Sequence, residues 1–354
     1  MPITKLLISN RGEIAVRIAQ SAAAKDVQTA SIFASDDADC AHIYKTDESF
    51  ALPGAGPEAY LDIEAIIAIA SENGYDAIHP GYGFLSESAY FALSCQEAGL
   101  VFVGPSPETL ELFGDKAGAR RHAQKLGLGV IPGTYRSTSF EEAKTFLDSL
   151  EGGAMMIKAV AGGGGRGMRE VRHAYELESA FERCSSEAHN SFGNGHLYVE
   201  ELIEAARHIE VQIVGDGSGR VSHLWDRDCS VQRRHQKIIE SAPSVGLAPQ
   251  LRHEMFDHAL RLGRSTSYRG VGTVEFLVAG EELYFIELNP RLQVEHTVTE
   301  EVTGIDLVEV QLALANGATL TSGSIDLHVD QLALSYGSLR SIGPQESITN
   351  ARVA

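Results

Sequence analysis

The first third of the chain alternates short apolar runs with amphipathic stretches, a pattern typical of an α/β protein. Residues 6–9 and 29–33 predict two strands, and between them Ile14, Ile18 and Ala22 recur at helical spacing. The same pattern predicts further helices over 63–70 and 115–126, strands over 76–78 and 101–103, and an N-cap at Ser106 followed by Pro107. This order predicts a layered α/β domain in which loops at the carboxyl ends of the strands can line a site.

A stretch with glycines and a proline over 127–133 interrupts this periodicity and predicts a linker. The pattern restarts near residue 138 as a smaller α/β unit. Its predicted elements are helices over 139–150 and 174–189 and strands over 154–160 and 197–201. We therefore expect structured regions on both sides of the linker.

The opening strand, turn and helix imitate a dinucleotide-binding unit. Asp36 and Asp37 follow the second predicted strand, where such a unit carries the acid that binds the ribose. The G-x-G-x-x-G fingerprint needs three glycines, however, and only Gly12 stands in this turn. We interpret the turn as structural and keep nicotinamide binding as the weaker alternative.

Composition narrows the function further. The 354 residues carry 29 Lys and Arg against 48 Asp and Glu, and the formal net charge of −19 disfavours nucleic acid and anionic lipid as partners. The longest aliphatic run, 65–70, is too short to cross a membrane. The four cysteines form no C-x-x-C pair, which argues against a zinc site and a disulfide framework. We expect no nucleic acid or membrane partner, and a location in the cytoplasm, or in the mitochondrial matrix of a eukaryote.

A glycine-rich segment follows one of the predicted strands. Five glycines occupy six positions over 162–167, and the strand before them carries Lys158. Backbone N–H groups of such a loop can surround an anion, and the lysine adds a positive charge for a phosphate. Because the lysine precedes the glycines, this is not a Walker A loop. We favour a cover over nucleotide phosphates; a flexible surface loop is the alternative.

Residues 271–278 and 283–289 predict the two strands of a hairpin. If its turn centres on Glu281, Glu275 lies opposite Glu287, and Thr273 lies opposite Asn289 on the same face. Facing carboxylates repel each other unless a cation lies between them, and Mg²⁺ prefers oxygen ligands of this kind. We favour a metal site here; two glutamates facing solvent are the alternative.

Two further segments carry charges suited to anions. Directly after the hairpin, Arg291 offers a fork that suits a planar oxyanion such as bicarbonate, and Glu295 lies close enough in sequence to remove its proton. An ordinary surface ion pair is the alternative. The basic stretch 227–237 is also a candidate anion site, with a solvated face or ion pairs to distant carboxylates as alternatives.

These motifs occur in one order: Asp115-Lys116, Lys158 with the 162–167 loop, Arg233-Arg234-His235-Gln236-Lys237, and the stretch 287–296. Together they resemble the biotin carboxylase component of biotin-dependent carboxylases of the acetyl-CoA, acyl-CoA or pyruvate carboxylase type, within the ATP-grasp superfamily. The likeness begins at 9–15 and continues to about residue 320. The His-Gln-Lys and Arg-Leu-Gln-Val-Glu-His stretches separate this family from other ATP-grasp enzymes.

The resemblance implies an ATP-dependent ligase that carboxylates biotin on a biotin carboxyl carrier domain, using bicarbonate through carboxyphosphate. It also implies a carboxyltransferase component as a partner and a homodimer. The implied fold is an amino-terminal α/β domain over 1–113 and an ATP-grasp domain over 114–330, with a small mobile lid over about 132–204. A divergent tail over 331–354 would complete the chain.

The resemblance assigns roles to individual residues. It implies that ATP is bound by Lys116, Lys158, Gly163, Gly164, Gly165, Gly167, Met168, His208, Gln232 and His235, with Glu200 to Ile203 lining the adenine pocket. Mg²⁺ or Mn²⁺ would be held by Glu275, Glu287 and Asn289. Bicarbonate would be bound by Lys237, Arg291, Gln293 and the backbone of Val294. Glu295 would be the base, and with Lys237 and Arg291 it forms the implied catalytic set.

The carboxyl-terminal part departs from the family. Family members continue through an Arg-Ile-Asn-Ala-Glu-like stretch whose arginine is thought to stabilise the biotin enolate, whereas the corresponding residues 328–337 differ here. We therefore expect an incomplete carboxyl-terminal subdomain. Glu201 also stands where the family often has lysine. Two alternative functions follow: a truncated nucleotide-binding fragment without full turnover, and another ATP-grasp carboxylate ligase.

Overall fold

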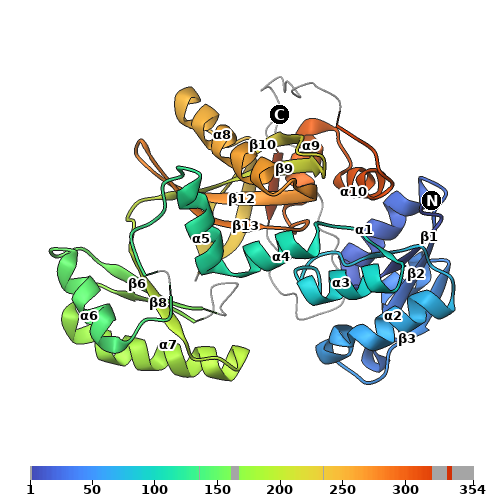
Figure 1. Cartoon of the computed structure of the whole chain (residues 1–354), viewed down its shortest axis with the longest axis horizontal. Coiled ribbons are helices and arrows are strands. Elements are labelled where there is room, and N and C mark those ends of the chain that lie inside the picture. Colours follow the sequence, from blue (N-terminus) through green and yellow to red (C-terminus); the bar gives the residue numbers. More distant parts are fainter. Residues whose placement is uncertain (1, 135, 161–166, 234, 321–332, 337–354) are drawn as a thin grey trace.

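The computed structural model describes residues 2–134, 136–160, 167–233, 235–320 and 333–336. Its amino-terminal part is a parallel five-stranded sheet in the order β3-β2-β1-β4-β5, flanked by helices (Figure 1). The elements are β1 (Lys5–Ile8), α1 (Gly12–Ala23), β2 (Gln28–Phe33), β3 (Glu48–Ala51), α2 (Ile63–Glu72), β4 (Ala77–His79), α3 (Ala89–Glu97) and β5 (Val101–Phe102), with 3-10 helices Ser35–Asp37, Ala41–Lys45 and Pro57–Leu61. Strands β1 and β2 are mostly buried, as expected for parallel strands covered on both faces, whereas the edge strand β3 is partly exposed.

The strand order reverses between β1 and β4, so the loops after these two strands meet at one edge of the sheet. The Asn10 side chain joins them by donating to the carbonyl oxygens of Pro80 at 2.7 Å and Tyr82 at 2.9 Å. The two loops line a hollow of about 410 Å³. Asp37, which the dinucleotide interpretation assigned to a ribose, instead pairs with Arg11 at 2.8 Å.

The middle of the molecule is an antiparallel six-stranded sheet in the order β13-β12-β9-β10-β11-β14. Its strands are β9 (Arg207–Asp216), β10 (Val221–Arg233), β11 (Gln236–Ala242), β12 (Arg269–Ala279), β13 (Glu282–Asn289) and β14 (Ala333–Tyr336). The helices around it are α4 (Pro107–Gly114), α5 (Lys116–Lys125), α8 (Pro249–Ser265), α9 (His296–Thr303) and α10 (Leu307–Ala315). Residues two apart share a face of a strand, and Ile209, Val211 and Ile213 form a core that includes Met255 and Ala259 of α8. The opposite face carries the polar residues described below.

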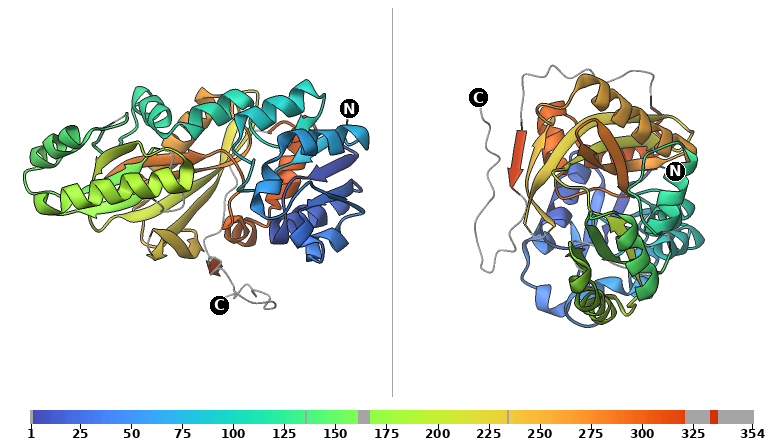
Figure 2. Two further views of the ribbon diagram at one scale, coloured as in Figure 1. Left: turned by 90° about the horizontal axis from the view of Figure 1, so that it is seen from below. Right: turned by 90° about the vertical axis from the view of Figure 1, so that its left-hand side faces the viewer.

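A smaller lobe lies at the opposite end from the amino-terminal sheet (Figures 1 and 2). It contains α6 (Phe140–Ser149), β6 (Met155–Ala159), β7 (Met168–Val171), a 3-10 turn (Ala174–Glu176), α7 (Leu177–Phe192) and β8 (Leu197–Glu201). Ser139 and Glu142 form a capping box that fixes the start of α6. The lobe has its own apolar core, which includes Leu147, Ile157 and Val199. This core is separate from the core of the central sheet.

The amino-terminal part, in contrast, shares a core with the central sheet. Ile14 and Ile18 of α1 belong to one buried cluster with Val271 of β12 and Leu307 and Leu312 of α10. Helix α10 therefore joins the two sheets, which fixes the loops after β1 and β4 relative to the central sheet.

The helices and strands predicted from the sequence are present, with ends shifted by up to three residues. The predicted linker 127–133 is bound on both sides: Phe285 donates its N–H to the Gly129 carbonyl oxygen at 2.8 Å, and Gly133 pairs with Glu200. Strands β9, β10 and β11 were not predicted. In the described part of the chain, no helix is both long and apolar enough to span a membrane.

Candidate active site

The hairpin β12-β13 has the predicted register. Glu275 pairs with Glu287, and Thr273 pairs with Asn289. Glu275 and Asn289 are only 4% and 8% exposed, so the alternative of two solvent-facing glutamates is wrong for Glu275. The Asn289 amide donates to Glu275 Oε1 at 2.9 Å and to Glu287 Oε1 at 3.3 Å. The fold thus brings together the three residues predicted to hold a metal.

Lys237 on β11 lies between three carboxylates. Its Nζ is 2.6 Å from Glu210 Oε2, 2.9 Å from Glu275 Oε1 and 2.6 Å from Glu295 Oε1. Burial lowers the pKa of Lys237, but the three carboxylates outweigh burial and raise this pKa well above its ordinary value. The lysine is therefore a fixed positive charge beside the predicted base, Glu295.

Three of the residues predicted to bind ATP lie near the facing glutamates. Lys116 Nζ at the start of α5 lies 3.0 Å from Glu287 Oε2. His208 Nε2 lies 2.8 Å from Glu275 Oε2, and the Gln232 amide is 2.9 Å from the other ring nitrogen of His208. Lys116 and His208 therefore contact the two facing glutamates from different elements, and Gln232 contacts His208.

The lobe contributes a second charged group. Lys158 on β6 pairs with Glu200 on β8, and Glu200 also pairs with Arg120 of α5. Arg120 in turn donates to the carbonyl oxygen of Ile131. Glu200 is 2% exposed, and its carboxylate pairs with both cations. These contacts connect the lobe to the central sheet through charge.

Arg291 and Gln293 follow the hairpin and border the same cluster. Arg291 Nε pairs with Glu87 at 2.5 Å, and its Nη2 donates to Asn289 Oδ1 at 3.3 Å. The Gln293 amide donates to Glu275 Oε1 at 2.9 Å. Glu87 comes from the segment between β4 and α3, so the arginine predicted to bind bicarbonate is held by the amino-terminal part.

Other predicted residues lie further out or outside the described structure. His235 is exposed in the turn between β10 and β11 with a φ of 60°, and no hydrogen bond or ion pair joins it to the described cluster. Val294 is 43% exposed. Gly167 and Met168 lie at the start of β7, and Ile203 follows β8. The remaining predictions, Gly163, Gly164, Gly165 and Arg234, lie outside the described residues.

The site also contains residues to which the sequence analysis assigned no role of their own. Glu210 and Arg227 are fully buried beside Lys237 and Gln293, with Arg227 Nε 2.5 Å from Glu210 Oε1. Glu87 and Arg120 pair with Arg291 and Glu200 across the chain. Arg227 and Lys237 form ion pairs with carboxylates that are distant in sequence, as one of the alternatives for the stretch 227–237 expected, while anion binding by this stretch stays a prediction. The alternation of apolar and polar residues over 209–213 was a signal for strand β9, which carries Glu210.

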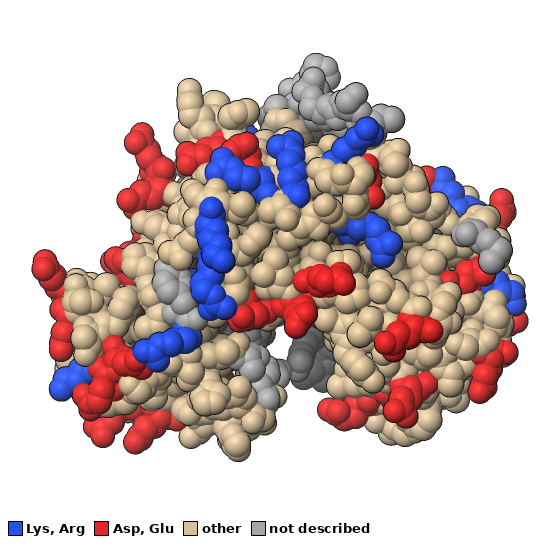
Figure 3. All heavy atoms as spheres, in the orientation of Figure 1, with Lys and Arg blue, Asp and Glu red and all other residues tan. Residues whose placement is uncertain are grey.

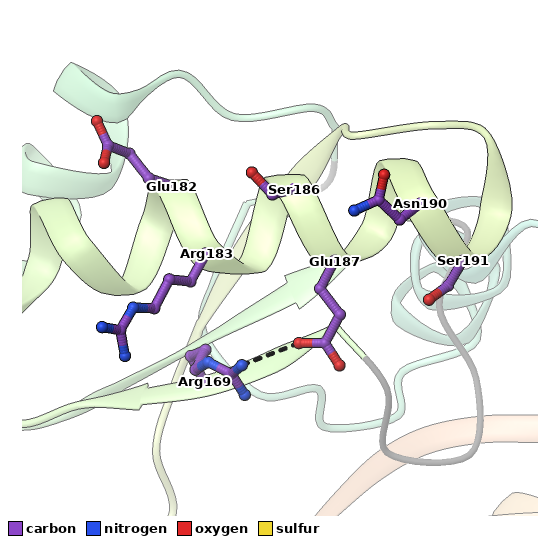
Figure 4. Close-up of a pocket in the computed structure, with 7 residues that line it drawn as sticks. All are labelled: Arg169, Glu182, Arg183, Ser186, Glu187, Asn190 and Ser191. Carbon is purple, nitrogen blue, oxygen red and sulfur yellow. Dashed lines mark hydrogen bonds and ion pairs between the residues drawn. The ribbon is translucent and has the colours of Figure 1, made fainter.

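The surface has another hollow, which lies away from this cluster. Figure 3 shows a notch between the lobe and the amino-terminal part, with acidic side chains along its upper edge. A hollow of about 540 Å³ lies on the lobe itself, between β7 and α7, where Arg169 pairs with Glu187 at 2.9 Å (Figure 4). None of the predicted site residues lines that hollow. The charged cluster on the central sheet is therefore the candidate active site.

The fold, an antiparallel sheet that carries two facing carboxylates next to a lobe that carries the partly buried Lys158, is that of the ATP-grasp class. Two family models agree: "Biotin carboxylase, N-terminal domain" matches residues 2–110, and "Carbamoyl-phosphate synthase L chain, ATP binding domain" matches residues 115–322. The chain belongs to the biotin carboxylase family.

Similar proteins have carboxylase names. Pyruvate carboxylase from Staphylococcus aureus is 54% identical over 329 residues, which are 92% of this chain and 28% of the relative. Biotin carboxylase from Campylobacter jejuni, solved with a β,γ-ATP compound, is 41% identical with a TM-score of 0.89, over 94% of this chain and 75% of that one.

The biotin carboxylase domain dimer of Hydrogenobacter thermophilus 2-oxoglutarate carboxylase was solved with MgADP, ADP and bicarbonate. It is 39% identical with a TM-score of 0.90, over 94% of this chain and 74% of that one. The chain thus spans about three quarters of these solved chains, but only 28% of the curated pyruvate carboxylases it matches.

Proposed function

We propose that this chain catalyses the ATP-dependent carboxylation of biotin with bicarbonate. The observation that carries the proposal is the position of Lys237, which lies between the carboxylates suited to a metal and Glu295, the candidate base. One cluster can therefore hold a nucleotide, a metal and a small anion side by side. The bound MgADP and bicarbonate of the Hydrogenobacter domain support this assignment.

The donor set at the hairpin fits Mg²⁺ or Mn²⁺. Glu275, Glu287 and Asn289 offer carboxylate and amide oxygens, which are the ligands that hard divalent cations prefer. A metal ion bound there would neutralise charge on the ATP phosphates. The Asn289 amide now turns its nitrogen to the glutamates and its oxygen to Arg291, so it would rotate to present its oxygen to a metal.

The chain's own residues would prepare both substrates. Lys116, Lys158, His208 and the glycine-rich loop would hold the ATP phosphates. Lys237, Arg291, Gln293 and the Val294 backbone would bind bicarbonate, from which Glu295 removes a proton. The bicarbonate oxygen then attacks the γ-phosphorus, which releases ADP and forms carboxyphosphate. This intermediate breaks down to CO₂ and phosphate; phosphate takes the proton from the biotin ureido nitrogen, and that nitrogen attacks CO₂.

We also propose that residues 132–204 act as the lid, because this lobe has a core of its own. Its closure would place Lys158 over the nucleotide and exclude water from carboxyphosphate, which is prone to hydrolysis. In this division, residues 1–113 form the amino-terminal domain and 114–330 the ATP-grasp domain. The contacts of Glu200 with Lys158 and Arg120 would have to rearrange during closure.

Partners follow from the relatives. A biotin carboxyl carrier domain would deliver biotin, a carboxyltransferase component would use the product, and the dimer named for the Hydrogenobacter domain supports a homodimer here. All four cysteines are free, which fits a reducing compartment such as the cytoplasm or mitochondrial matrix.

The test is phosphate release from ATP and Mg²⁺, with and without bicarbonate and free biotin. The proposal expects turnover that requires bicarbonate, increases with biotin and is lost in Glu295→Gln. Glu97→Gln, an exposed glutamate on α3, is the matched control and should behave as wild type. ATP-induced thermal stabilisation without turnover would favour the binding fragment, and turnover with a different acid would favour another carboxylate ligase.

A further inference from the structure

Arg227 is a fully buried arginine at the centre of the site face of the sheet. Its guanidinium group is 0% exposed, and a guanidinium group has five N–H donors. All five find acceptors: Nε donates to Glu210 Oε1 at 2.5 Å, Nη1 to Gln212 Oε1 at 2.8 Å and Thr299 Oγ1 at 2.7 Å, and Nη2 to Thr273 Oγ1 and Gln293 Oε1 at 3.1 Å each. Burying such a charge is costly for stability, and well-packed apolar residues often serve stability as well. Stability alone therefore does not account for it.

The first consequence concerns the orientation of Gln293. Because Arg227 donates to Gln293 Oε1, the amide nitrogen of Gln293 must point the other way, where it donates to Glu275 Oε1 at 2.9 Å. The side chain therefore presents N–H groups on the side of the bicarbonate residues. Without Arg227 the orientation of the amide would be held by Glu275 alone, and an amide rotated by 180° would present its carbonyl oxygen, which repels an anion.

The second consequence concerns the charge of Lys237. Glu210 uses one oxygen for Arg227 and the other for Lys237. The single negative charge of this carboxylate is thus divided between two cations. With Arg227 absent, Glu210 would neutralise Lys237 more completely, and less positive charge would be available for an anion.

We propose that Arg227 is a positioning residue that sets the affinity of the site for bicarbonate, by fixing the amide of Gln293 and by competing with Lys237 for Glu210. Arg227 does not itself touch substrate in this role. The proposal rests on the proposed function, because it assigns Gln293 and Lys237 to bicarbonate.

The test compares Arg227→Lys with the double variant Arg227→Met/Glu210→Leu, which replaces the buried pair by apolar residues of similar size. Arg252→Lys is the matched control, because Arg252 also pairs with a buried carboxylate, Asp226, at 3.0 Å, but contacts none of the bicarbonate residues. Thermal melting and the fraction that binds ATP establish folding, and phosphate release gives KM for bicarbonate and for ATP.

A lost charge-assisted donor corresponds to about a tenfold effect or more. We expect KM for bicarbonate to rise about tenfold or more in Arg227→Lys. The rise should be smaller in the double variant, because loss of Glu210 leaves Lys237 less neutralised. KM for ATP should stay within about twofold in both, and Arg252→Lys should keep the wild-type bicarbonate KM. A purely structural role would lower kcat through fewer active molecules and leave KM unchanged, and that result would overturn the inference.

A second measurement uses Gln293→Ala. If Arg227 acts through this amide, Arg227→Lys should raise the bicarbonate KM by a smaller factor in the Gln293→Ala background than in the wild type. Equal factors in both backgrounds would contradict that route. If the wild-type protein shows no bicarbonate-dependent turnover, the proposed function is refuted. If the wild type is active and the variants keep its KM for bicarbonate, only the role of Arg227 is refuted.

Discussion

Glu240 offers a test of the electrostatics of this site that does not depend on catalysis. It lies on β11 and is 3% exposed, and its Oε2 has no hydrogen-bond partner among the described residues. The carboxylates of Glu295 and Glu210 and the cations Lys237 and Arg227 act on it. Burial, supported by the two carboxylates, raises the pKa of Glu240 to about 7. Between pH 4.5 and about 7, Glu240 therefore keeps a proton in the folded protein that it would release in the unfolded chain.

The sign of the effect on stability follows from this pKa. Between the ordinary value of 4.5 and about 7, the folded state binds more protons at Glu240 than the unfolded state does. The contribution of this group to the free energy of unfolding is therefore full below pH 4.5 and is lost as pH rises to about 7. The difference corresponds to about 3 kcal/mol. Glutamine cannot ionise, so the free energy of unfolding of Glu240→Gln should not include this pH-dependent loss.

We expect Glu240→Gln to be more stable than wild type by about 2–3 kcal/mol at pH 8, and within about 1 kcal/mol of it at pH 5. Urea denaturation at both pH values measures the difference, in which the titration of all other groups largely cancels. The exposed Glu97→Gln should show no pH-dependent difference. If Glu240→Gln differs from wild type equally at both pH values, the carboxyl group is not protonated in the folded protein, and the electrostatic picture of the cluster fails.

Three further predictions concern the site and the amino-terminal sheet. Glu87→Gln should lower the bicarbonate KM severalfold, because Arg291 loses its ion pair; an unchanged or higher KM in phosphate-release assays would contradict this. Glu287→Gln should lose most of the additional thermal stabilisation that Mg²⁺ adds to ATP alone, whereas retained stabilisation would place the metal elsewhere. Burial lowers the pKa of His79 to about 3, so the unfolded state binds more protons below pH 6.5 and stability falls by up to about 3 kcal/mol by pH 4. His79→Asn, which keeps an acceptor for the Gly81 N–H, should flatten this decline in urea denaturation, and an equally steep decline would contradict the assignment.

The hairpin shows which parts of the site a sequence can reveal. A turn near Glu281 and alternating side chains fix the register, so the pairing of Glu275 with Glu287 followed from counting residues. The sequence also predicted a helix cap at Ser106, whose side chain accepts the Thr109 N–H at 3.3 Å. In both cases the determining contacts lie within a few residues of a turn or a helix end.

The partners of Arg227 show what the sequence did not reveal. Ile209, Val211 and Ile213 alternate with Glu210 and Gln212, and such alternation ordinarily indicates a strand with one solvated face. The structure buries both faces, because the second face is covered by polar groups from β10, β12 and α9 that are distant in sequence. Likewise, the main-chain pairs of Gly129 and Gly133 leave no pattern in side-chain identity. Pairings of this kind depend on the assembled sheet.

The charges of the site explain how a place for a metal and an anion can be stable within one chain. Glu275 accepts from Lys237, Asn289 and Gln293 and pairs with His208, so its carboxylate is compensated by protein groups. A metal bound at Glu275 would take over this compensation and free the Lys237 charge for an anion. Binding of nucleotide and metal would therefore increase the affinity of the site for bicarbonate. The size of the increase would depend on Glu210, a carboxylate that would still pair with Lys237. That is why a buried arginine with no substrate contact can influence the affinity for bicarbonate.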